Sequence, residues 1–396
     1  MISVTEANDI ILSYPYRTSK EIVTLDNALG RTLAEAIRAD RDFPPFDRVS
    51  MDGIAIRFAA YQSGRLSFVI EGTQAAGQPA TSLKEETNCL EVMTGTLLPS
   101  GTDTVVPYEW IEVQDGTATL LNKAVVAGQN VHGRASDVKQ NDTLLEPGTP
   151  ITPAEIALLA TTGNVEVLVY SRPRIAVLST GDELVDIDRQ PLPHQIRKSN
   201  SYVLLAALQE AGFPADTFHL PDDKEKLSKA IANVLQHYDV IILSGGVSKG
   251  KFDYVPQALE VNGITKLFHQ VNQRPGKPFW FGRSEQHTVF ALPGNPVSTH
   301  LCFYRYIKPW LAHSVGLSAA PSHAILAGDF SFSPSITYFL QVAVKNEAGK
   351  LMAYPHVGSG SGDFANLKLV TGFLELPFDK TDFKTGEVYP YYALRH

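Results

Sequence analysis

Three short apolar runs between residues 171 and 315 are each followed by small residues. They run from Ile175 to Leu178, from Val240 to Leu243 and from Val289 to Leu292. Each run is too short for a helix, so each predicts a strand whose end lets the backbone approach a ligand closely. Such strands alternate with helical spacing, which predicts a three-layer α/β domain with a mostly parallel sheet. Sheets of this kind bind ligands at the carboxyl ends of their strands.

Helix start signals support this alternation. Ser199 or Asn200 is expected to cap a helix that Gly212 ends, and Asp222 with Glu225 is expected to open a second one. The connections between strands and helices are short. Residues 171–315 are therefore expected to form one α/β domain.

The N-terminal region has a different pattern. Ser3 followed by Glu6 predicts a capping box and a first helix, and apolar residues at helical spacing predict a second helix over 25–37. Residues 42–133 change to short β-type runs between Gly, Pro and Ser clusters, and helical spacing returns at 154–160. We expect a framework domain, residues 1–41 and 134–170, interrupted by an inserted β domain, residues 42–133.

The last part of the chain again reads as β-structure. Runs from Tyr338 to Val344 and from Gly372 to Leu376 predict a small C-terminal β domain over residues 316–396. A chain of 396 residues exceeds what one hydrophobic core usually serves. The expected fold class is therefore multidomain, α/β plus β.

Composition narrows the range of partners. The chain is 44% hydrophobic and 19% charged, with a formal net charge of −8, which argues against a general affinity for nucleic acid or an anionic membrane. The two cysteines, Cys89 and Cys302, form no metal-binding or disulfide pattern, and no signal or membrane segment is apparent. We expect a cytoplasmic protein that meets any bound anion with local groups.

Glycines after the predicted strands indicate what that anion is. Gly245, Gly246 and Ser248 are expected to present N–H groups and a hydroxyl to a phosphate at the start of the next helix. A glycine pair after a strand can also form only a tight turn. Three such strand ends in one region favour a phosphate-type ligand.

Six motifs occur in order across nearly the whole chain. They are Ser50-Met51-Asp52-Gly53-Ile54-Ala55, Met93-Thr94-Gly95, Ser179-Thr180-Gly181-Asp182-Glu183-Leu184, Ser244-Gly245-Gly246-Val247-Ser248 with Asp253-Tyr254, Pro275-Gly276-Lys277-Pro278, and Leu292-Pro293-Gly294-Asn295-Pro296. Together they resemble the motifs of the molybdopterin molybdenumtransferase family, which includes MoeA and the E domain of gephyrin and plant Cnx proteins.

This resemblance implies an elongated homodimer with four domains per chain, and a cleft between the α/β domain of one subunit and the inserted β domain of the other. It implies that molybdate and adenylylated molybdopterin are the substrates, that AMP is released, and that a divalent cation assists. Asp52 and Thr94 would then be catalytic residues that act in trans. A transient contact with the adenylyltransferase is a further implied interaction.

Acidic residues near the strand ends are candidates for cation binding. Mg²⁺ suits the implied reaction because it takes one or two carboxylates and keeps its other sites for phosphate oxygens and water. Asp222 and Asp253 are the expected metal ligands, Asp253 being catalytic as well, and Glu183 is expected to orient a water or the ligand. Alternatively, Asp222 only caps its helix, and Asp182 with Glu183 only closes a turn.

The remaining motif residues are expected to bind the substrate. Arg274 and Lys277 are assigned to molybdate or the terminal phosphate, because proline and glycine fix the turn that aims them; the alternative is a solvated basic turn. Pro293 and Pro296 are expected to hold the two residues between them rigidly against the ligand. The other expected contacts are Ser179, Thr180, Gly181, Asp182, Gly245, Gly246, Ser248, Gly294 and Asn295.

Four positions depart from the family pattern. Ala135-Ser136-Asp137 replaces a common Gly-Glu-Asp, Lys198 replaces an Asp, Arg274 replaces a Lys, and Gln341 stands where an Arg is frequent. The acids assigned above are retained, so activity is expected. Lys198 is hypothesised to restore a phosphate contact that is lost elsewhere.

Three rival functions stay open at this level. A molybdopterin adenylyltransferase-like nucleotide enzyme would usually lack the inserted and C-terminal β domains, and a competence-damage-like enzyme would lack the Ser-Met-Asp-Gly motif. A non-catalytic scaffold similar to gephyrin would keep the fold. Molybdate-dependent AMP release distinguishes the scaffold from the transferase.

Overall fold

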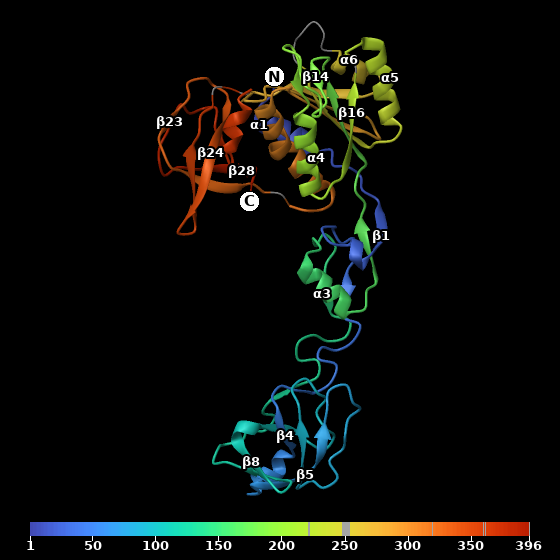
Figure 1. The fold of residues 1–396 in the computed structure, drawn as a ribbon, viewed down its shortest axis with the longest axis vertical. Coiled ribbons are helices and arrows are strands. Elements are labelled where there is room, and N and C mark those ends of the chain that lie inside the picture. The colour runs from blue at the N-terminus through green and yellow to red at the C-terminus, as the bar shows by residue number, and fades with distance from the viewer. Residues whose placement is uncertain (221, 248–253, 319, 359, 361, 396) are drawn as a thin grey trace.

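The computed structural model describes residues 1–220, 222–247, 254–318, 320–358, 360 and 362–395. The chain is elongated, with the α/β and C-terminal parts at one end and the strands of residues 53–120 at the other (Figure 1). Between these ends lies a slender segment that contains α3 (Pro153–Thr161). Among the described residues, no helix has the length and apolar character that crossing a membrane requires.

Six strands build the central sheet: β13 (Ile175–Thr180), β16 (Ala215–Leu220), β17 (Val240–Ser244), β18 (Thr265–Gln270), β20 (Pro278–Arg283) and β21 (Thr288–Leu292). Their order is β16-β13-β17-β21-β20-β18. The first four strands run parallel, and β20 pairs antiparallel with both β21 and β18. This confirms the predicted mostly parallel sheet.

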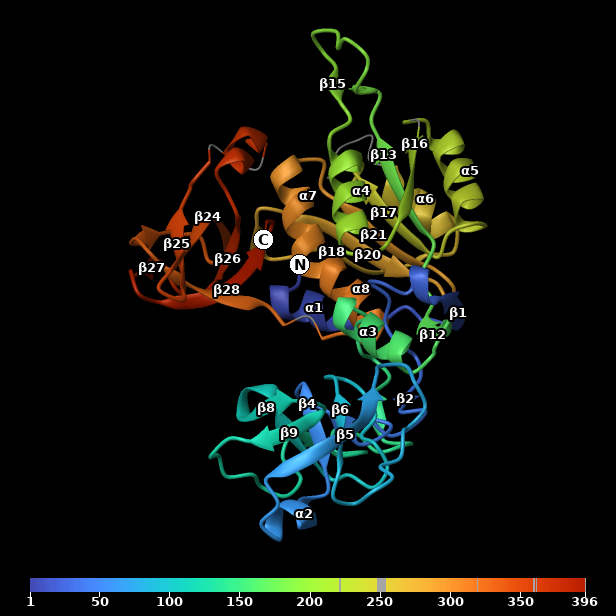
Figure 2. The ribbon, with the colours of Figure 1, turned by 60° about the horizontal axis from the view of Figure 1, so that its bottom comes forward.

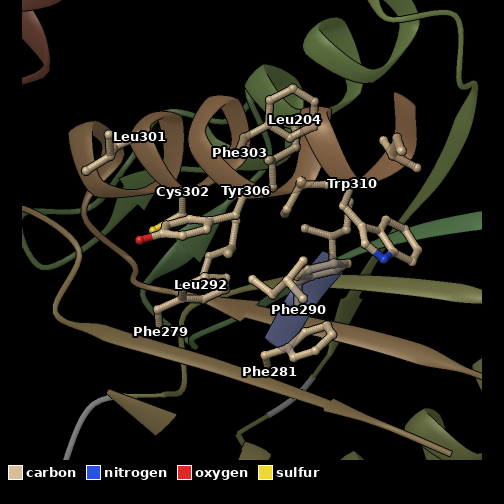
Figure 3. Packing of buried hydrophobic residues seen from close by; sticks show 14 of the residues in the cluster. Leu204, Phe279, Phe281, Phe290, Leu292, Leu301, Cys302, Phe303, Tyr306 and Trp310 are labelled. Atoms are coloured by element: carbon tan, nitrogen blue, oxygen red, sulfur yellow. The ribbon is translucent and has the colours of Figure 1, made fainter. Parts of the chain in front are cut away.

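Helices cover both faces of this sheet. They are α1 (Val4–Leu12), α4 (Asn200–Glu210), α5 (Lys224–Leu235), α6 (Val255–Val261), α7 (Pro296–Cys302), the π-helical turn η3 (Phe303–Ile307) and α8 (Lys308–Ser314). Alternate strand residues face opposite sides: Val177 packs toward α4, α7 and α8, and Leu178 toward α5 and α6. Phe290 and Trp310 pack ring against ring in the first of these cores (Figure 3). The parallel strands β13, β17 and β21 are therefore buried on both faces, which holds their carboxyl ends in place.

Of the predicted helix starts, that of α1 is confirmed and that of α5 differs in detail. Ser3 and Glu6 form the predicted capping box of α1. Helix α5 is capped by Asp223, whose side chain accepts from the backbone N–H of Lys226, so the prediction that Asp222 opens this helix is wrong. The alternative reading of Asp222 as a helix cap is therefore also wrong, and its carboxylate is left for another role.

The predicted helix over residues 25–37 is also wrong. Its first residues form a short 3₁₀ turn, η1 (Leu25–Asn27), and its last residue opens the short strand β2 (Ile37–Arg38). Gly30 has a φ of +71°, which ends any helix. Ala28 is buried from the last residue of the 3₁₀ turn, and Leu33 is buried where it forms a β-bridge with Val169. The slender segment also contains the strands β1 (Lys20–Thr24), β11 (Thr143–Leu145) and β12 (Glu166–Tyr170). The short strands β3 (Arg48–Val49) and β10 (Val131–His132) pair with each other and pack against the inserted region.

The inserted region forms a second six-stranded sheet in the order β7-β4-β6-β5-β9-β8. Its strands are β4 (Gly53–Ile56), β5 (Ser67–Gln74), β6 (Cys89–Val92), β7 (Thr104–Pro107), β8 (Ile111–Gln114) and β9 (Thr117–Leu120). A short helix α2 (Phe58–Gln62) and a 3₁₀ turn η2 (Tyr108–Trp110) complete it. The β character predicted for this region is confirmed.

The C-terminal region forms a third sheet that closes on itself, because β24 pairs with both β25 and β26. Its elements are β22 (Ser322–Leu326), β23 (Phe330–Ser331), β24 (Thr337–Glu347), β25 (Lys350–Pro355), η4 (Phe364–Lys368), β26 (Gly372–Leu376), β27 (Asp382–Phe383) and β28 (Val388–Ala393). The strand β19 (Gln273–Arg274) of the α/β part pairs with β24. This pairing places the C-terminal sheet beside the strand ends of the central sheet (Figure 2).

Candidate active site

The carboxyl ends of the parallel strands surround a cavity of about 370 Å³. It lies where β13, β17 and β21 end, which is the place expected for a ligand of an open α/β sheet. Its lining residues are Thr180, Gly181, Glu183, Asp222, Gly245, Gly246, Val247, Pro278, Pro293, Gly294 and Asn295. The structure thus brings the predicted residues of three motifs into one cavity.

The glycine pair after β17 turns tightly at the floor of this cavity. Gly245 and Gly246 have φ angles of +96° and +70°, which favour glycine. The N–H of Gly245 donates to the carbonyl of Leu292 at 3.1 Å, so the prediction that it faces a phosphate is wrong. Within the described chain, the N–H of Gly246 donates to no backbone carbonyl. Ser248 lies outside the described residues.

A side chain at Gly246 would disturb this turn. A Cβ atom there would lie 2.6 Å from Cγ2 of Val255 and 3.0 Å from Oγ1 of Thr180. We predict that Gly246→Ala weakens AMP binding at least tenfold by calorimetry, because strain and overlap together displace the turn. Gly263→Ala is the matched control, since Gly263 has a φ of +79° and open space around it. Equal AMP affinities of the two variants would contradict this role of the turn.

Acidic side chains meet on one side of the cavity. Glu183 and Asp222 both line it, and the N–H of Asp182 donates to Oδ2 of Asp222 at 3.3 Å. Burial raises the pKa of the Asp222 carboxyl above its ordinary value, and the neighbouring Asp182 and Glu183 raise it further. The described residues include no cluster of three metal-binding side chains, and Asp253 lies outside them.

Asp182 and Glu183 also form a turn. Leu184 donates to the carbonyl of Gly181 at 3.0 Å, which closes the chain between β13 and the short strand β14 (Leu184–Val185). The two residues therefore close a turn and also take part in the site. Asp182 donates its backbone N–H to Asp222, and Glu183 lines the cavity.

A second cavity, of about 600 Å³, adjoins the first and shares Thr180, Glu183, Gly245, Gly294 and Asn295 with it. It lies between the start of α4 and a projecting loop, residues 184–197, whose two ends pair as the short parallel strands β14 and β15 (Ile196–Arg197) (Figure 2). Its lining residues are Ser179, Thr180, Glu183, Leu184, Pro191, Gln195, Ile196, Arg197, Lys198, Ser199, Asn200, Ser201, Ser244, Gly245, Gly294, Asn295, Pro296, Gly362 and Phe364.

Asn200 ties the two strand-end loops together at this point. Its Nδ2 donates to Oγ of Ser244 at 2.8 Å and to the carbonyl of Gly294 at 2.7 Å. Because a carbonyl can only accept, these contacts set the orientation of the amide. Ser179 is held separately, by a 3.0 Å hydrogen bond between its Oγ and Nδ1 of His219.

A third cavity, of about 590 Å³, lies between the α/β part and the C-terminal sheet. Arg274 and Lys277 line it together with Gln341, and none of its described lining residues is acidic. Phe332 and Tyr338 stack on each other at 4.1 Å between ring centroids, and the Arg274 guanidinium lies 5.9 Å from the ring centroid of Phe332. The two predicted cations therefore face one cavity, although Asp222 and Glu183 face another.

The Pro-Gly-Asn-Pro turn separates the first and third cavities. Pro293 and Asn295 line both of them, and Pro296 is the first residue of α7. Thr299 donates through Oγ1 to the carbonyl of Pro293 at 2.8 Å, which fixes the turn. The supporting role predicted for the two prolines stays a prediction.

Asp52 and Thr94 lie next to each other in the inserted region. Oδ1 of Asp52 accepts from the N–H of Thr94 at 2.6 Å and from its Oγ1 at 2.7 Å. These two hydrogen bonds lower the pKa of the Asp52 carboxyl. Within one chain the pair lies at the end of the molecule away from the three cavities (Figure 1).

Sequence reasoning missed two groups near these cavities. His219 lies on the edge strand β16, outside every sequence motif described above. Phe364 lines the second cavity from the C-terminal part. The lowered pKa of His219, caused mainly by burial and then by Lys198, favours its neutral form. Only the three-dimensional arrangement could have shown Phe364, because no local pattern marks it.

The structure is that of a multidomain α/β protein with cavities at the carboxyl ends of its central sheet. Residues 2–163 match the MoeA N-terminal region (domain I and II), residues 176–313 a probable molybdopterin binding domain, and residues 323–394 the MoeA C-terminal region (domain IV). The chain belongs to the molybdopterin molybdenumtransferase (MoeA) family.

Individual relatives support this assignment. A molybdopterin molybdenumtransferase of Synechocystis is 41% identical over 99% of this chain and 100% of its own length. One from Haemophilus influenzae is 34% identical over 80% of this chain and 78% of its own. The crystal structure of the molybdopterin biosynthesis MoeA protein from Pyrococcus horikoshii superposes with a TM-score of 0.85 at 27% identity, covering 100% of both chains.

Proposed function

We propose that this chain is a molybdopterin molybdenumtransferase that inserts molybdate into adenylylated molybdopterin and releases AMP. Its family membership supports a role in molybdenum cofactor biosynthesis. The observation that carries the proposal is the division of charge among adjoining cavities. Acids line the cavity at the strand ends, and cations without acids line the described part of the cavity next to the C-terminal sheet.

The first cavity suits the phosphate groups of the adenylylated substrate. The N–H of Gly246 and the small residues around it allow a close approach of phosphate oxygens. Asp222 and Glu183 supply the one or two carboxylates that Mg²⁺ takes when phosphate and water provide its other ligands. Bound there, Mg²⁺ would neutralise charge that develops on the phosphate oxygens. Asp253 stays a proposed ligand and catalytic residue on the strength of its motif.

The third cavity suits the oxyanion. Arg274 and Lys277 belong to no ion pair within the described chain, so their charges are available to a ligand. Ser298 also lines this cavity. We assign molybdate to these cations, since a tetrahedral dianion needs positive charge and hydrogen-bond donors around it.

We also propose that the working unit is a homodimer in which Asp52 and Thr94 of one subunit complete the cleft of the other. Their exposed position far from the cavities of their own chain supports this arrangement. Transient contact with the adenylyltransferase and a cytoplasmic location stay predictions. The match of the whole chain to full-length transferases favours this function over a shorter adenylyltransferase-like enzyme.

The proposal is tested by AMP release from adenylylated molybdopterin in the presence of Mg²⁺, with and without molybdate. We predict molybdate-dependent release, and a rise of about tenfold in the KM for molybdate in Lys277→Ala, because one charge-assisted contact is lost. Lys277→Arg keeps the charge and should retain most of the affinity. AMP release that is independent of both molybdate and Mg²⁺ would refute the assignment.

A further inference from the structure

The second cavity differs in charge from the first. Among its described lining residues, Arg197 and Lys198 are cationic and Glu183 is the one acid. Leu184 and Ile196, at the two ends of the projecting loop, give it an apolar wall. The cavity therefore combines an apolar surface with a positively charged side, next to the strand ends that suit phosphate.

Lys198 is held at the edge of this cavity. Its side chain is only 14% exposed, and its Nζ lies 2.8 Å from Oδ1 of Asp186, a residue of the projecting loop whose side chain is 63% exposed. The backbone N–H of Lys198 donates to the carbonyl of Val185 at 3.0 Å, which fixes the lysine against the base of this loop. The Lys198 ammonium lowers the pKa of the Asp186 carboxyl.

The start of α4 adds further positive character beside Lys198. Ser199 precedes the eleven-residue helix, and its side chain makes no capping hydrogen bond. The N–H groups of the first turn therefore donate to no capping side chain among the described residues, and Asn200 and Ser201 of this turn line the same cavity. Oδ1 of Asn200 is a buried acceptor without a hydrogen-bond partner.

We infer that Lys198 binds a phosphate group of the adenylylated substrate, and that Asp186 is an internal counter-ion which the phosphate displaces. This inference rests on the proposed function. The lysine and the uncapped helix start line the second cavity, and Gly245 of the glycine turn lines both the second and the first. A phosphate there replaces a carboxylate that is largely solvated, so its displacement costs little.

The role of Asp186 separates this inference from a purely structural ion pair. If the pair only supports the projecting loop, removal of either partner weakens ligand binding. If the phosphate competes with Asp186 for Lys198, the two substitutions act in opposite directions. Removal of the lysine then weakens binding, and removal of the carboxylate strengthens it.

Calorimetric titration of the full-length protein with AMP tests this. Lys198→Met is expected to weaken AMP binding about tenfold and to reduce its dependence on salt concentration, because a charge-assisted contact is lost. Asp186→Asn is expected to tighten AMP binding about threefold. An affinity of Lys198→Met within twofold of the unaltered protein, or equal weakening by both substitutions, would overturn the inference.

Lys266→Met is the matched control. Lys266 also forms an ion pair, with Glu260 at 3.4 Å, and lines none of the three cavities. This substitution removes the same charge and is expected to leave AMP binding unchanged. Molybdate-dependent AMP release by the unaltered protein tests the proposed function separately. Release that is intact in the unaltered protein, with unchanged binding in Lys198→Met, refutes the inference alone.

Discussion

Replacing Asp52 by alanine is expected to lower molybdate-dependent AMP release by about 100-fold or more, the range typical for loss of a positioned catalytic carboxylate. Asp52 is exposed, and its carboxylate is held by two hydrogen bonds from Thr94 that lower its pKa. It is therefore ionised at neutral pH and oriented in advance. Because it buries no apolar surface, thermal unfolding of the variant should change little. Steady-state assays of AMP release check the effect.

Thr94→Ser provides the matched control for Asp52→Ala. Serine keeps both the backbone N–H and the hydroxyl that donate to Asp52, so activity should stay close to that of the unaltered protein. Mixing Asp52→Ala subunits with Glu183→Gln subunits should restore part of the activity if the cleft is shared. A lack of restoration in proven mixed dimers would contradict the arrangement in trans.

Replacing Arg305 by methionine is expected to destabilise the junction of the α/β and C-terminal parts by about 3 kcal/mol, as loss of one partner of a buried ion pair does. Nε of Arg305 donates to Oε2 of Glu375 at 2.8 Å, and its NH1 donates to Oδ1 of Asn8 at 2.7 Å. The two charged side chains are only 11% and 19% exposed. Removal of the arginine leaves the Glu375 carboxylate without its charge partner in a site with little water.

Hydrogen exchange of β26 amides measures this loss where it occurs, because a multidomain chain does not unfold in one step. The double variant Arg305→Met with Glu375→Gln should recover part of the stability, since it no longer buries an unpaired charge. Arg174→Met is a control that removes a guanidinium that is 63% exposed from its pair with Asp239. Unchanged β26 protection in Arg305→Met would contradict the role of this ion pair.

The pattern of apolar residues and glycines predicted the strand ends correctly, and the reason is physical. A short apolar run buried on both faces of a sheet has few alternatives to a strand, and the glycines that follow it must turn. The helix predicted over residues 25–37 does not form, because the helical spacing of its apolar residues is coincidental. Gly30 interrupts it, and side chains such as Leu33 are buried by contacts with residues 145–169, which are distant in sequence.

The site could be predicted in its residue types but not in its detailed contacts. Two adjacent aspartates precede α5, and sequence alone could not say that Asp223 caps the helix and leaves Asp222 for the cavity. The N–H of Gly245 is taken by a neighbouring strand end, a contact that depends on sheet order. Phe364 reaches the second cavity only because the C-terminal sheet docks beside the strand ends. The functional roles, and the domain boundaries, stay predictions.

The central claim is that the glycine turns at the ends of β13, β17 and β21 hold the phosphate of the substrate. A crystal structure of the dimer soaked with AMP and molybdate tests it most directly. The account predicts the AMP phosphate within hydrogen-bonding distance of the Gly246 N–H and molybdate beside Lys277. AMP bound elsewhere, with this cavity closed by protein, would contradict it.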